Sequence, residues 1–299
     1  MSLNKKRLLF IYNPKAGKGQ IKSHLMDIID IFAKNSYEVT AYPTQRAGHA
    51  IEITRQRDRD YDLVVCSGGD GTMDEIVTGM MMCEQKTPIG YIPAGSTNDF
   101  ANSLHIPKNM IKAATVAVNG KKFACDIGAF NDDSFVYIAA FGIFTDVSYE
   151  TDQQMKNVLG HMAYIMEGMK RISAIKPFHY KVSYDDKVLE DDFIFGMVTN
   201  SISVGGFKRI TGKYVELDDG VFEVTLIKVP KNPVELNTIM AALLMRDIDT
   251  DLMYCFKTEK VTFESGEDIP WTLDGEFGGN HKQVIIENKR QALEIMIPE

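Results

Sequence analysis

The pattern best suited to chemistry is a run of three glycines around an acid, Gly68-Gly69-Asp70-Gly71-Thr72, one residue after the apolar residues Leu63–Cys66. A turn of bare backbone N–H groups behind a buried strand suits an anion such as a nucleotide phosphate. Phosphate repels a carboxylate unless a divalent cation lies between them or the nucleotide donates hydrogen bonds to it. Asp70 therefore favours phosphate with Mg²⁺, although glycine-rich strand–helix turns also occur without ligands.

Two further loops suit phosphate. The loop Asn13–Gly19 (Asn-Pro-Lys-Ala-Gly-Lys-Gly) follows the apolar run Leu8–Tyr12, and Pro93–Asp99 (Pro-Ala-Gly-Ser-Thr-Asn-Asp) follows Pro88–Ile92. Lys18 adds a cation that can meet a phosphate, while the default position for a single lysine is a solvated surface. The chain has neither G-x-x-x-x-G-K-[ST] nor the third glycine of a dinucleotide turn, so these loops form no standard nucleotide fingerprint.

Two more acids stand at the ends of expected elements. Asp99 begins a helical pattern, where an acid is as readily an N-terminal cap or dipole partner. If the expected sheet brings Asp99 beside Asp70 at one edge, Asp99 is a candidate for holding Mg²⁺ or orienting an acceptor hydroxyl. Asp274 lies in Trp271-Thr272-Leu273-Asp274-Gly275-Glu276, and Asp-Gly alone is more often a hairpin turn. If the second half of the chain folds back over a cleft beside the glycine loops, Asp274 can act as the general base that deprotonates an attacking hydroxyl.

The first 120 residues alternate apolar runs with helical patterns. This alternation predicts a parallel, Rossmann-like α/β sheet. The loops after its strands then meet at the carboxyl edge, where such sheets bind ligands, and Thr44 lies on that edge too. We expect strands at Leu8–Tyr12, Glu38–Tyr42, Leu63–Ser67 and Pro88–Ile92, and helices from Ile21, after Gly48 to Arg57, and from Met73 to Met82 with Thr72 as its cap.

The second half changes character to alternating, β-branched and aromatic runs separated by Asn-Asp, Asp-Asp and Asp-Gly turns. It predicts an antiparallel β-sandwich, so the domains are residues 1–122 and 123–299, with the last residues allowed to pack back on the first domain. A cleft between the domains is the expected site. We expect strands at Phe123–Phe130, Ser134–Phe144, Phe178–Tyr184, Val188–Asn200, Val221–Val229, Lys260–Phe263 and His281–Ile286, and helices at Gln153–Ile172 and Pro233–Met245.

The composition sets broad limits on function. The 299 residues are 44% hydrophobic and 25% charged, which is typical of a folded globular protein. The net charge of −8, without a long basic tract, excludes nucleic acid as a partner. Four separated cysteines in apolar surroundings predict buried free thiols in a reducing compartment. No apolar run approaches the roughly 20 residues of a spanning helix, so we expect a cytoplasmic protein with transient, peripheral membrane contact.

The ordered set of motifs resembles a known family. The Asn13–Lys18 loop, the Gly68–Thr72 turn, the run Gly95–Ala101 and the late Asp274-Gly275-Glu276 occur in this order. Together they are similar to the diacylglycerol kinase catalytic-domain family, most closely to the soluble bacterial diacylglycerol and lipid kinases, in one superfamily with sphingosine kinases and NAD kinases. The resemblance covers essentially the whole chain and implies a nucleotide-binding α/β domain followed by a β-sandwich domain, with the site between them.

The resemblance also implies roles for residues. Asp274 would be the catalytic base, with Asp70 and Asp99 working with it and a catalytic Mg²⁺. A second, structural Mg²⁺ would take the side chain of Asp219 and main-chain oxygens of Glu216 and Val221, where the alternative is an ordinary Asp-Gly hairpin. The residues implied for ATP are Asn13, Pro14, Lys15, Ala16, Gly17, Lys18, Thr44, Gly68, Gly69, Asp70, Gly71, Thr72, Met73, Asp74, Glu75 and Ser96.

We therefore expect an ATP- and Mg²⁺-dependent lipid kinase that phosphorylates the free hydroxyl of diacylglycerol to phosphatidate. The alternatives are a kinase for a sphingoid base, another lipid alcohol or NAD, and a non-catalytic nucleotide- or lipid-binding regulator. The lipid substrate would be met at a membrane surface, with entry near Met155–Ile172, although core packing explains any single methionine there more readily. A homodimer stays open.

Overall fold

The computed structural model describes residues 6–57, 60–142, 176–201, 203–204, 207–208, 215–245 and 250–299. The chain forms two compact units. Unit 1 comprises Met1–Ile127 and Gln291–Glu299, and unit 2 comprises Gly128–Arg290. The helix expected at Gln153–Ile172, and with it the expected lipid entry, lies outside the described residues.

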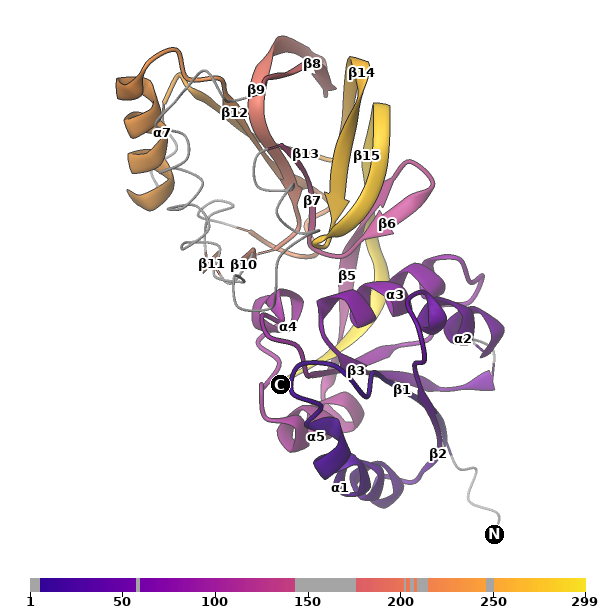
Figure 1. Cartoon of the computed structure of the whole chain (residues 1–299). Coiled ribbons are helices and arrows are strands. Elements are labelled where there is room, and N and C mark those ends of the chain that lie inside the picture. The colour runs from indigo at the N-terminus through magenta and orange to yellow at the C-terminus, as the bar shows by residue number, and fades with distance from the viewer. Residues whose placement is uncertain are drawn as a thin grey trace. The chain divides into compact units, whose positions relative to one another are not determined.

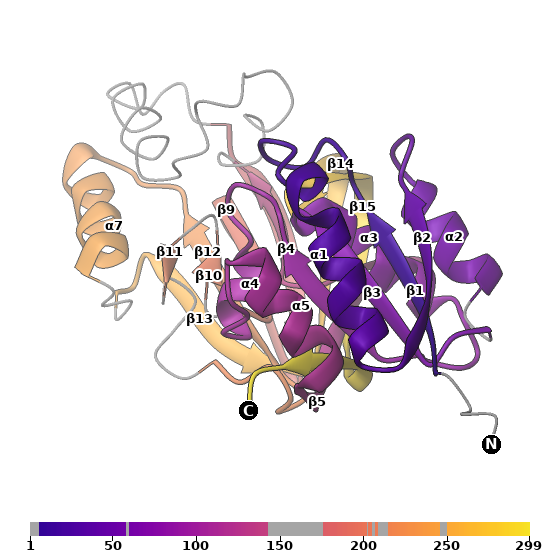
Figure 2. The same ribbon diagram turned by 90° about the horizontal axis from the view of Figure 1, so that it is seen from below.

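Unit 1 is built on a sheet of parallel strands. Its order is the end of β15, then β4, β3, β1 and β2, and every neighbouring pair is parallel. Helices α1 and α5 pack together on one face and α2 and α3 on the other (Figure 1), and Figure 2 shows α1 and α5 in front of the strands. The elements are β1 Lys6–Tyr12, α1 Ile21–Lys34, β2 Tyr37–Pro43, α2 His49–Arg57, β3 Leu63–Gly68, α3 Asp70–Met81, β4 Ile89–Pro93, α4 Asp99–Ser103, α5 Met110–Asn119, β5 Lys121–Phe130 and β15 Glu276–Ile297.

The core of unit 1 explains this arrangement. All six residues of β3 and all five of β4 are buried, as continuous apolar runs covered on both faces must be. Helix α1 contributes Ile21, Ile28 and Phe32 at helical spacing. Because the loops after β1, β3 and β4 all leave the same edge of parallel strands, the sheet brings them together.

The expected cap of α3 is wrong. Thr72 was expected to precede a helix that begins at Met73, but α3 begins at Asp70 and its N-cap is Gly69. Gly69 is extended, with φ −85° and ψ −175°, so the chain turns from strand to helix within one residue. Thr72 therefore lies in the first turn of the helix, where its hydroxyl accepts a hydrogen bond from another loop.

Unit 2 is antiparallel. Strand β9 pairs with β7 and β8, and β14 pairs with the same two strands, so these four strands form a closed circuit. Strands β12 and β13 extend the sheet beyond β9, and β15 extends it beyond β14. The further elements are β6 Asp133–Phe135, β7 Ile138–Gly142, β8 Phe178–Tyr184, β9 Lys187–Thr199, β10 Ser203–Val204, β11 Phe207–Lys208, β12 Phe222–Lys228, α7 Pro233–Met245, β13 Met253–Thr258 and β14 Lys260–Leu273.

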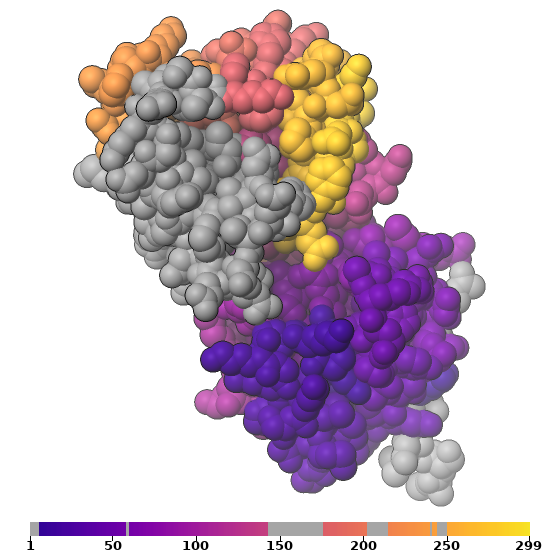
Figure 3. Space-filling view, viewed as in Figure 1, coloured from indigo at the N-terminus to yellow at the C-terminus, as the bar shows by residue number. Residues whose placement is uncertain are grey.

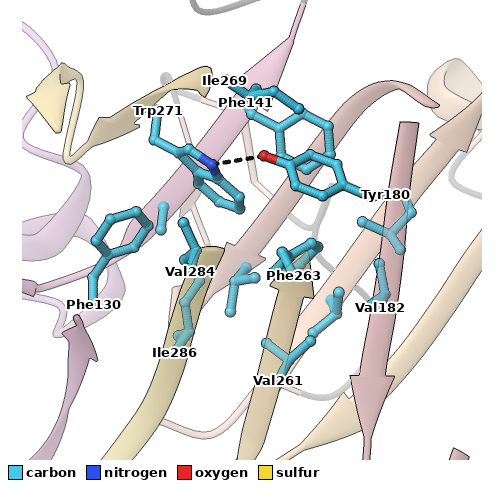
Figure 4. Close-up of a cluster of buried hydrophobic side chains, with 14 of the residues drawn as sticks. Phe130, Phe141, Tyr180, Val182, Val261, Phe263, Ile269, Trp271, Val284 and Ile286 are labelled. Carbon is cyan, nitrogen blue, oxygen red and sulfur yellow. Dashed lines mark hydrogen bonds between the residues drawn. The ribbon is translucent and has the colours of Figure 1, made fainter. Parts of the chain in front are cut away.

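An aromatic core fills unit 2. Trp271 is fully buried and its indole Nε1–H donates to the Tyr180 hydroxyl at 3.0 Å, which satisfies two polar atoms inside the cluster (Figure 4). Phe141 and Phe263 meet the indole ring with centroids at 4.9 and 5.1 Å. Since Trp271 lies three residues before Asp274, this packing fixes the end of β14.

Several expected strands differ in extent. The single run expected at Ser134–Phe144 is divided into two strands with different partners. Strand β6 pairs with β5, and β7 pairs with β9. Strands β14 and β15 run well beyond the short segments expected near Lys260–Phe263 and His281–Ile286, and their atoms form a continuous gold and yellow strip on the visible surface of unit 2 (Figure 3). Strand β13 was not expected at all. The pairing partner, rather than local alternation, sets these lengths.

The cysteines also differ from expectation in part. All four are free thiols, and Cys66 and Cys125 are buried as expected. Cys255 is exposed on edge strand β13 and Cys83 is half-buried, so the prediction of burial is wrong for Cys255. No helix within the described residues is both long and apolar enough to cross a bilayer.

Candidate active site

Glycines allow the three loops at the strand ends of unit 1 to touch. Gly17 has a φ of +54°, and a Cβ there would lie 2.2 Å from the carbonyl oxygen of Ala94. A Cβ on Gly95 would lie 2.7 Å from the Cα of Gly69. Any side chain at these positions would force the loops apart. The loops predicted to bind phosphate therefore form one surface of closely packed backbone.

Asn13 links two of these loops. Its backbone N–H donates to the Ser67 carbonyl at 2.8 Å, and its side-chain Nδ2 donates to the Thr72 hydroxyl at 3.3 Å. Its Oδ1 accepts from the backbone N–H of Lys15 at 2.9 Å. Asn13 thus acts as a brace between the loop after β1 and the start of α3, a role that its place in a phosphate loop alone did not predict.

The carboxylate of Asp70 holds the start of α4. It accepts from the backbone N–H groups of Asp99 at 3.2 Å and of Phe100 at 3.4 Å. Asp99 itself is buried as the first residue of α4, and the N-cap position belongs to Asn98 in a left-handed conformation with φ +53°. The carboxylate of Asp70, at the start of α3, therefore does the capping that was one alternative for Asp99.

The two acids share an electrostatic environment. Burial first, and then interactions with Asp70, Cys66 and Asp99 in that order, raise the pKa of the Tyr91 hydroxyl well above its usual value. That hydroxyl donates to the Gly68 carbonyl at 3.3 Å. Unit 1 thus brings Asp99 next to Asp70 of the glycine turn. The convergence of both with Asp274 stays a prediction, since Asp274 belongs to unit 2.

Glu75 has a structural role that sequence reasoning missed. Its two carboxylate oxygens accept from the backbone N–H groups of Gly48 at 2.8 Å and of Ala50 at 3.0 Å. These donors stand at the start of α2, whose first N–H groups have no partner within the helix. Glu75 therefore ties α3 to α2. Thr44 lies on the same edge of the sheet and donates its backbone N–H to the Tyr12 carbonyl at 2.9 Å.

Apart from Gly68, the last residue of β3, and Thr44, which follows β2, the residues implied for ATP lie in the three loops or in the first turns of α3. Lys15, Lys18 and Ser96 are exposed, so two cationic side chains are available to solvent-borne phosphates. The remaining residues in the set are Asn13, Pro14, Ala16, Gly17, Thr44, Gly68, Gly69, Asp70, Gly71, Thr72, Met73, Asp74 and Glu75, and they are half-buried or buried except for the exposed Gly17.

Asp274 is held by backbone groups of its own unit. Its carboxylate accepts three hydrogen bonds, from the N–H groups of Val136 at 2.6 Å and of Tyr137 and Ile138 at 2.9 Å each. The Tyr137 hydroxyl donates to the Asp274 carbonyl at 3.0 Å. Asp274 has a φ of +51° and is buried. This acid is therefore fixed in position by the two residues before β7 and by the first residue of that strand.

Glu276 is the second acid of the same turn. It lies two residues after Asp274, at the first position of β15, and its side chain is exposed. The sequence marked it only as part of the Asp-Gly-Glu motif. The two carboxylates of this turn therefore differ in burial, Asp274 being buried and Glu276 exposed.

The predicted structural metal ligands lie at the entry to β12. The Asp219 Oδ1 accepts from the Val221 N–H at 3.1 Å, and Glu216 is exposed. Lys257 lies 3.3 Å from Asp219 Oδ2 and 2.9 Å from Glu223 Oε1. Burial raises the pKa of Glu223 to about 7, against the lowering effect of the Lys257 ammonium. Among the described residues no three His, Cys, Asp or Glu side chains are gathered for a metal ion.

Comparison with known proteins accounts for both units. Residues 7–130 match the family model of the diacylglycerol kinase catalytic domain, and residues 138–297 match that of the YegS C-terminal NAD kinase beta sandwich-like domain. A diacylglycerol kinase of Staphylococcus carnosus (strain TM300) is 35% identical over 298 residues, which cover 99% of this chain and 96% of the relative. The chain belongs to the diacylglycerol kinase family. The resemblance stated from the motifs is thereby confirmed.

Other members of the diacylglycerol kinase family agree. A diacylglycerol kinase of Bacillus subtilis (strain 168) is 33% identical over 276 residues, covering 92% of this chain and 91% of the relative. The crystal structure of a diacylglycerol kinase from Bacillus anthracis str. Sterne has a TM-score of 0.77 at 23% identity, covering 98% of this chain and 97% of that one. The family identifies this chain as a kinase, an enzyme that takes its phosphoryl group from ATP. The two-domain architecture with a β-sandwich second domain is also confirmed.

Proposed function

We propose that this enzyme transfers the γ-phosphate of ATP to the free hydroxyl of diacylglycerol and so makes phosphatidate. The observation that carries the proposal is the match, over more than nine-tenths of both chains, to relatives named diacylglycerol kinase. The packing of the three phosphate-suited loops against Asp70 and Asp99 supports it. A pure binding protein has no need of a further acid in the Asp274 turn.

We infer that unit 1 is a Rossmann-like nucleotide domain. Its residues fit ATP for two reasons. The loops have glycine at positions where a Cβ would collide with the backbone of a neighbouring loop, and the side chains of Lys15 and Lys18 in one of these loops are exposed. They fit Mg²⁺ because this ion is commonly held by one or two carboxylates together with substrate phosphates, and Asp70 and Asp99 are two such carboxylates. Bound there, the ion would neutralise charge on the transferring phosphoryl group.

The Asp274–Glu276 turn would supply the proton acceptor for the lipid hydroxyl. Asp274 is the predicted base, and three backbone N–H donors hold its carboxylate in one orientation. Glu276 is exposed and has the same chemistry. We infer that at least one of the two carboxylates accepts the proton, and substitution of each in turn assigns the role.

Diacylglycerol resides in a bilayer, so the reaction would take place during transient contact with a membrane surface. The net charge of −8 favours only weak attraction to anionic lipids. Co-sedimentation with vesicles that contain or lack diacylglycerol measures this contact: we expect binding that rises with the diacylglycerol content. The homodimer stays a prediction for measurement by light scattering.

The deciding experiment is a radiolabelled-ATP assay over a panel of acceptors. The panel contains diacylglycerol, a monoacylglycerol, a sphingoid base and NAD, each with and without Mg²⁺, and Asp70→Asn serves as the control for contaminating kinases. We expect Mg²⁺-dependent labelling of diacylglycerol by the wild type alone. Preferred labelling of the sphingoid base or of NAD would replace the proposed acceptor.

A further inference from the structure

A lysine joins two acids beside the turn implied to hold the structural Mg²⁺. Glu223 and Lys257 are direct cross-strand partners on β12 and β13. The Lys257 ammonium lies 2.9 Å from Glu223 Oε1 and 3.3 Å from Asp219 Oδ2. The Glu223 side chain is only 7% exposed. One positive charge thus bridges a buried carboxylate and the acid of the turn.

The turn also closes on itself. Gly220 has a φ of +86°, which lets the chain reverse, and the Val221 N–H donates to Asp219 Oδ1 at 3.1 Å. A Cβ on Gly220 would lie 3.0 Å from the Cδ of Arg290. A second basic side chain therefore runs along the turn. Both oxygens of Asp219 already have a partner within unit 2.

These contacts do not fit a bound Mg²⁺ at Asp219. The ion requires several oxygen ligands in near-octahedral geometry. It would also lie beside the Lys257 ammonium, and the two positive charges would repel each other. Displacing the ammonium would also take away the ion-pair partner of the buried Glu223 side chain, whose Oε1 lies 2.9 Å from it. The family's expected ion and this lysine compete for the same negative charge.

We propose that Lys257 supplies the positive charge that a structural cation would supply at the Glu216–Val221 turn, so that unit 2 folds without Mg²⁺. Asp219 and Glu223 share the lysine, which ties the entry of β12 to the end of β13. The proposal concerns folding and is independent of the acceptor that the enzyme phosphorylates.

Thermal unfolding without nucleotide tests the proposal. For the wild type we expect the Tm in MgCl₂ and in EDTA to differ by less than about 1 °C. Lys257→Met should lower the Tm by several degrees, and MgCl₂ should restore part of the loss because Asp219 is then open to the ion. Lys260→Met, which removes a nearby exposed lysine, is the matched control and should leave the Tm and its insensitivity to Mg²⁺ unchanged.

Asp219→Asn separates this turn from any other cation site. A wild-type Tm that rises with Mg²⁺, with the rise lost in Asp219→Asn, would overturn the proposal, whereas an equal rise in both supports it by placing the ion elsewhere. A Lys257→Met protein as stable as Lys260→Met would also overturn it. If Lys257→Met does not fold, Lys257→Met with Glu223→Gln removes the buried charge pair together, and we expect that variant to fold and to gain stability with Mg²⁺.

Discussion

Asp70 in unit 1 and Asp274 in unit 2 are both strand-end acids next to glycine, yet the protein holds them differently. Asp70 is half-buried, and its hydrogen bonds from the N–H groups at the start of a five-residue helix are long, at 3.2 and 3.4 Å. Asp274 is buried and accepts three hydrogen bonds of 2.6 to 2.9 Å from consecutive residues before and within β7.

This difference indicates different duties. Long hydrogen bonds at a half-buried carboxylate are weak and can lengthen further as a cation approaches. Three short bonds to one buried carboxylate are costly to remove, because each buried N–H would lose its acceptor. Asp70 is therefore suited to meet a ligand, and Asp274 is suited to fix the turn that carries Glu276.

The largest effect is expected for Asp274→Asn. The amide has one acceptor oxygen in place of two, so the unfolding free energy should fall by about 1–3 kcal/mol. Turnover should fall by roughly 10²–10⁴-fold, the effect of losing a base or its positioning, while ATP binding changes little. Urea unfolding, ATP affinity and steady-state turnover are the measurements. Unchanged turnover would remove Asp274 from the mechanism.

Glu276→Gln completes this comparison. Because Glu276 is exposed, we expect the free energy of unfolding to stay within about 0.5 kcal/mol of wild type. A turnover loss as large as that of Asp274→Asn, at wild-type stability, assigns proton transfer to Glu276 and positioning to Asp274. Normal turnover in Glu276→Gln would instead leave Asp274 as the base.

Asp70→Ala should weaken Mg·ATP binding by about tenfold or more. It also leaves the Asp99 and Phe100 N–H groups without this acceptor, which should cost about 1 kcal/mol of stability, as for a lost helix cap. Asp70→Asn is the matched variant, since it keeps an acceptor oxygen and should recover stability but not affinity. Calorimetric titration with Mg·ATP and urea unfolding measure the two effects, and unchanged Mg·ATP affinity in both variants would contradict the proposed cation bridge.

Glu75→Gln distinguishes a structural acid from a ligand for ATP. The loss of one charged acceptor at the start of α2 should reduce the unfolding free energy by about 1 kcal/mol. The KM for ATP should change by less than about threefold. A large rise in KM at wild-type stability would show instead that Glu75 serves the nucleotide.

The smallest effect concerns an exposed ion pair on β8 and β9. His179 lies 2.8 Å from Asp192 and 3.2 Å from Glu190, and hydrogen bonds to these acids raise its pKa. A histidine whose pKa is higher in the folded than in the unfolded protein stabilises the folded state at pH values below its unfolded-state pKa. This stabilisation is lost as the pH rises through its folded-state pKa. Since the side chain is 59% exposed, the contribution should be only a few tenths of a kcal/mol. Urea unfolding of wild type and His179→Gln should differ at pH 5.5 and converge in alkaline solution, and a difference that grows with pH would contradict this.

The sequence predicted the elements of unit 1 well because its signals are local. Buried parallel strands are continuous apolar runs, and glycine loops mark their ends, so Gly68–Thr72 and Asn13–Gly19 were found at the correct edge. The exact start of α3 was not predicted because it depends on the extended backbone of Gly69. The amino-acid type alone does not specify that conformation.

Contacts in unit 2 were harder to predict from the sequence because they join residues far apart in the chain. The donors to Asp274 lie 136 to 138 residues earlier in the chain, and no local pattern reports contacts at that separation. The same holds for Lys257, whose partner Asp219 is 38 residues away. Strand β13 was missed because Met253–Thr258 is short and its pairing with β12 alone defines it.

The last strand of unit 1 has a consequence for the synthesis of the protein. Residues 291–297 of β15 emerge from the ribosome after every residue of unit 2, yet Ile295 pairs with Ile89 on β4. Until then the first domain has an open sheet edge, which is prone to misassembly. The sheet of unit 1 is therefore completed only after the whole of unit 2 has been translated.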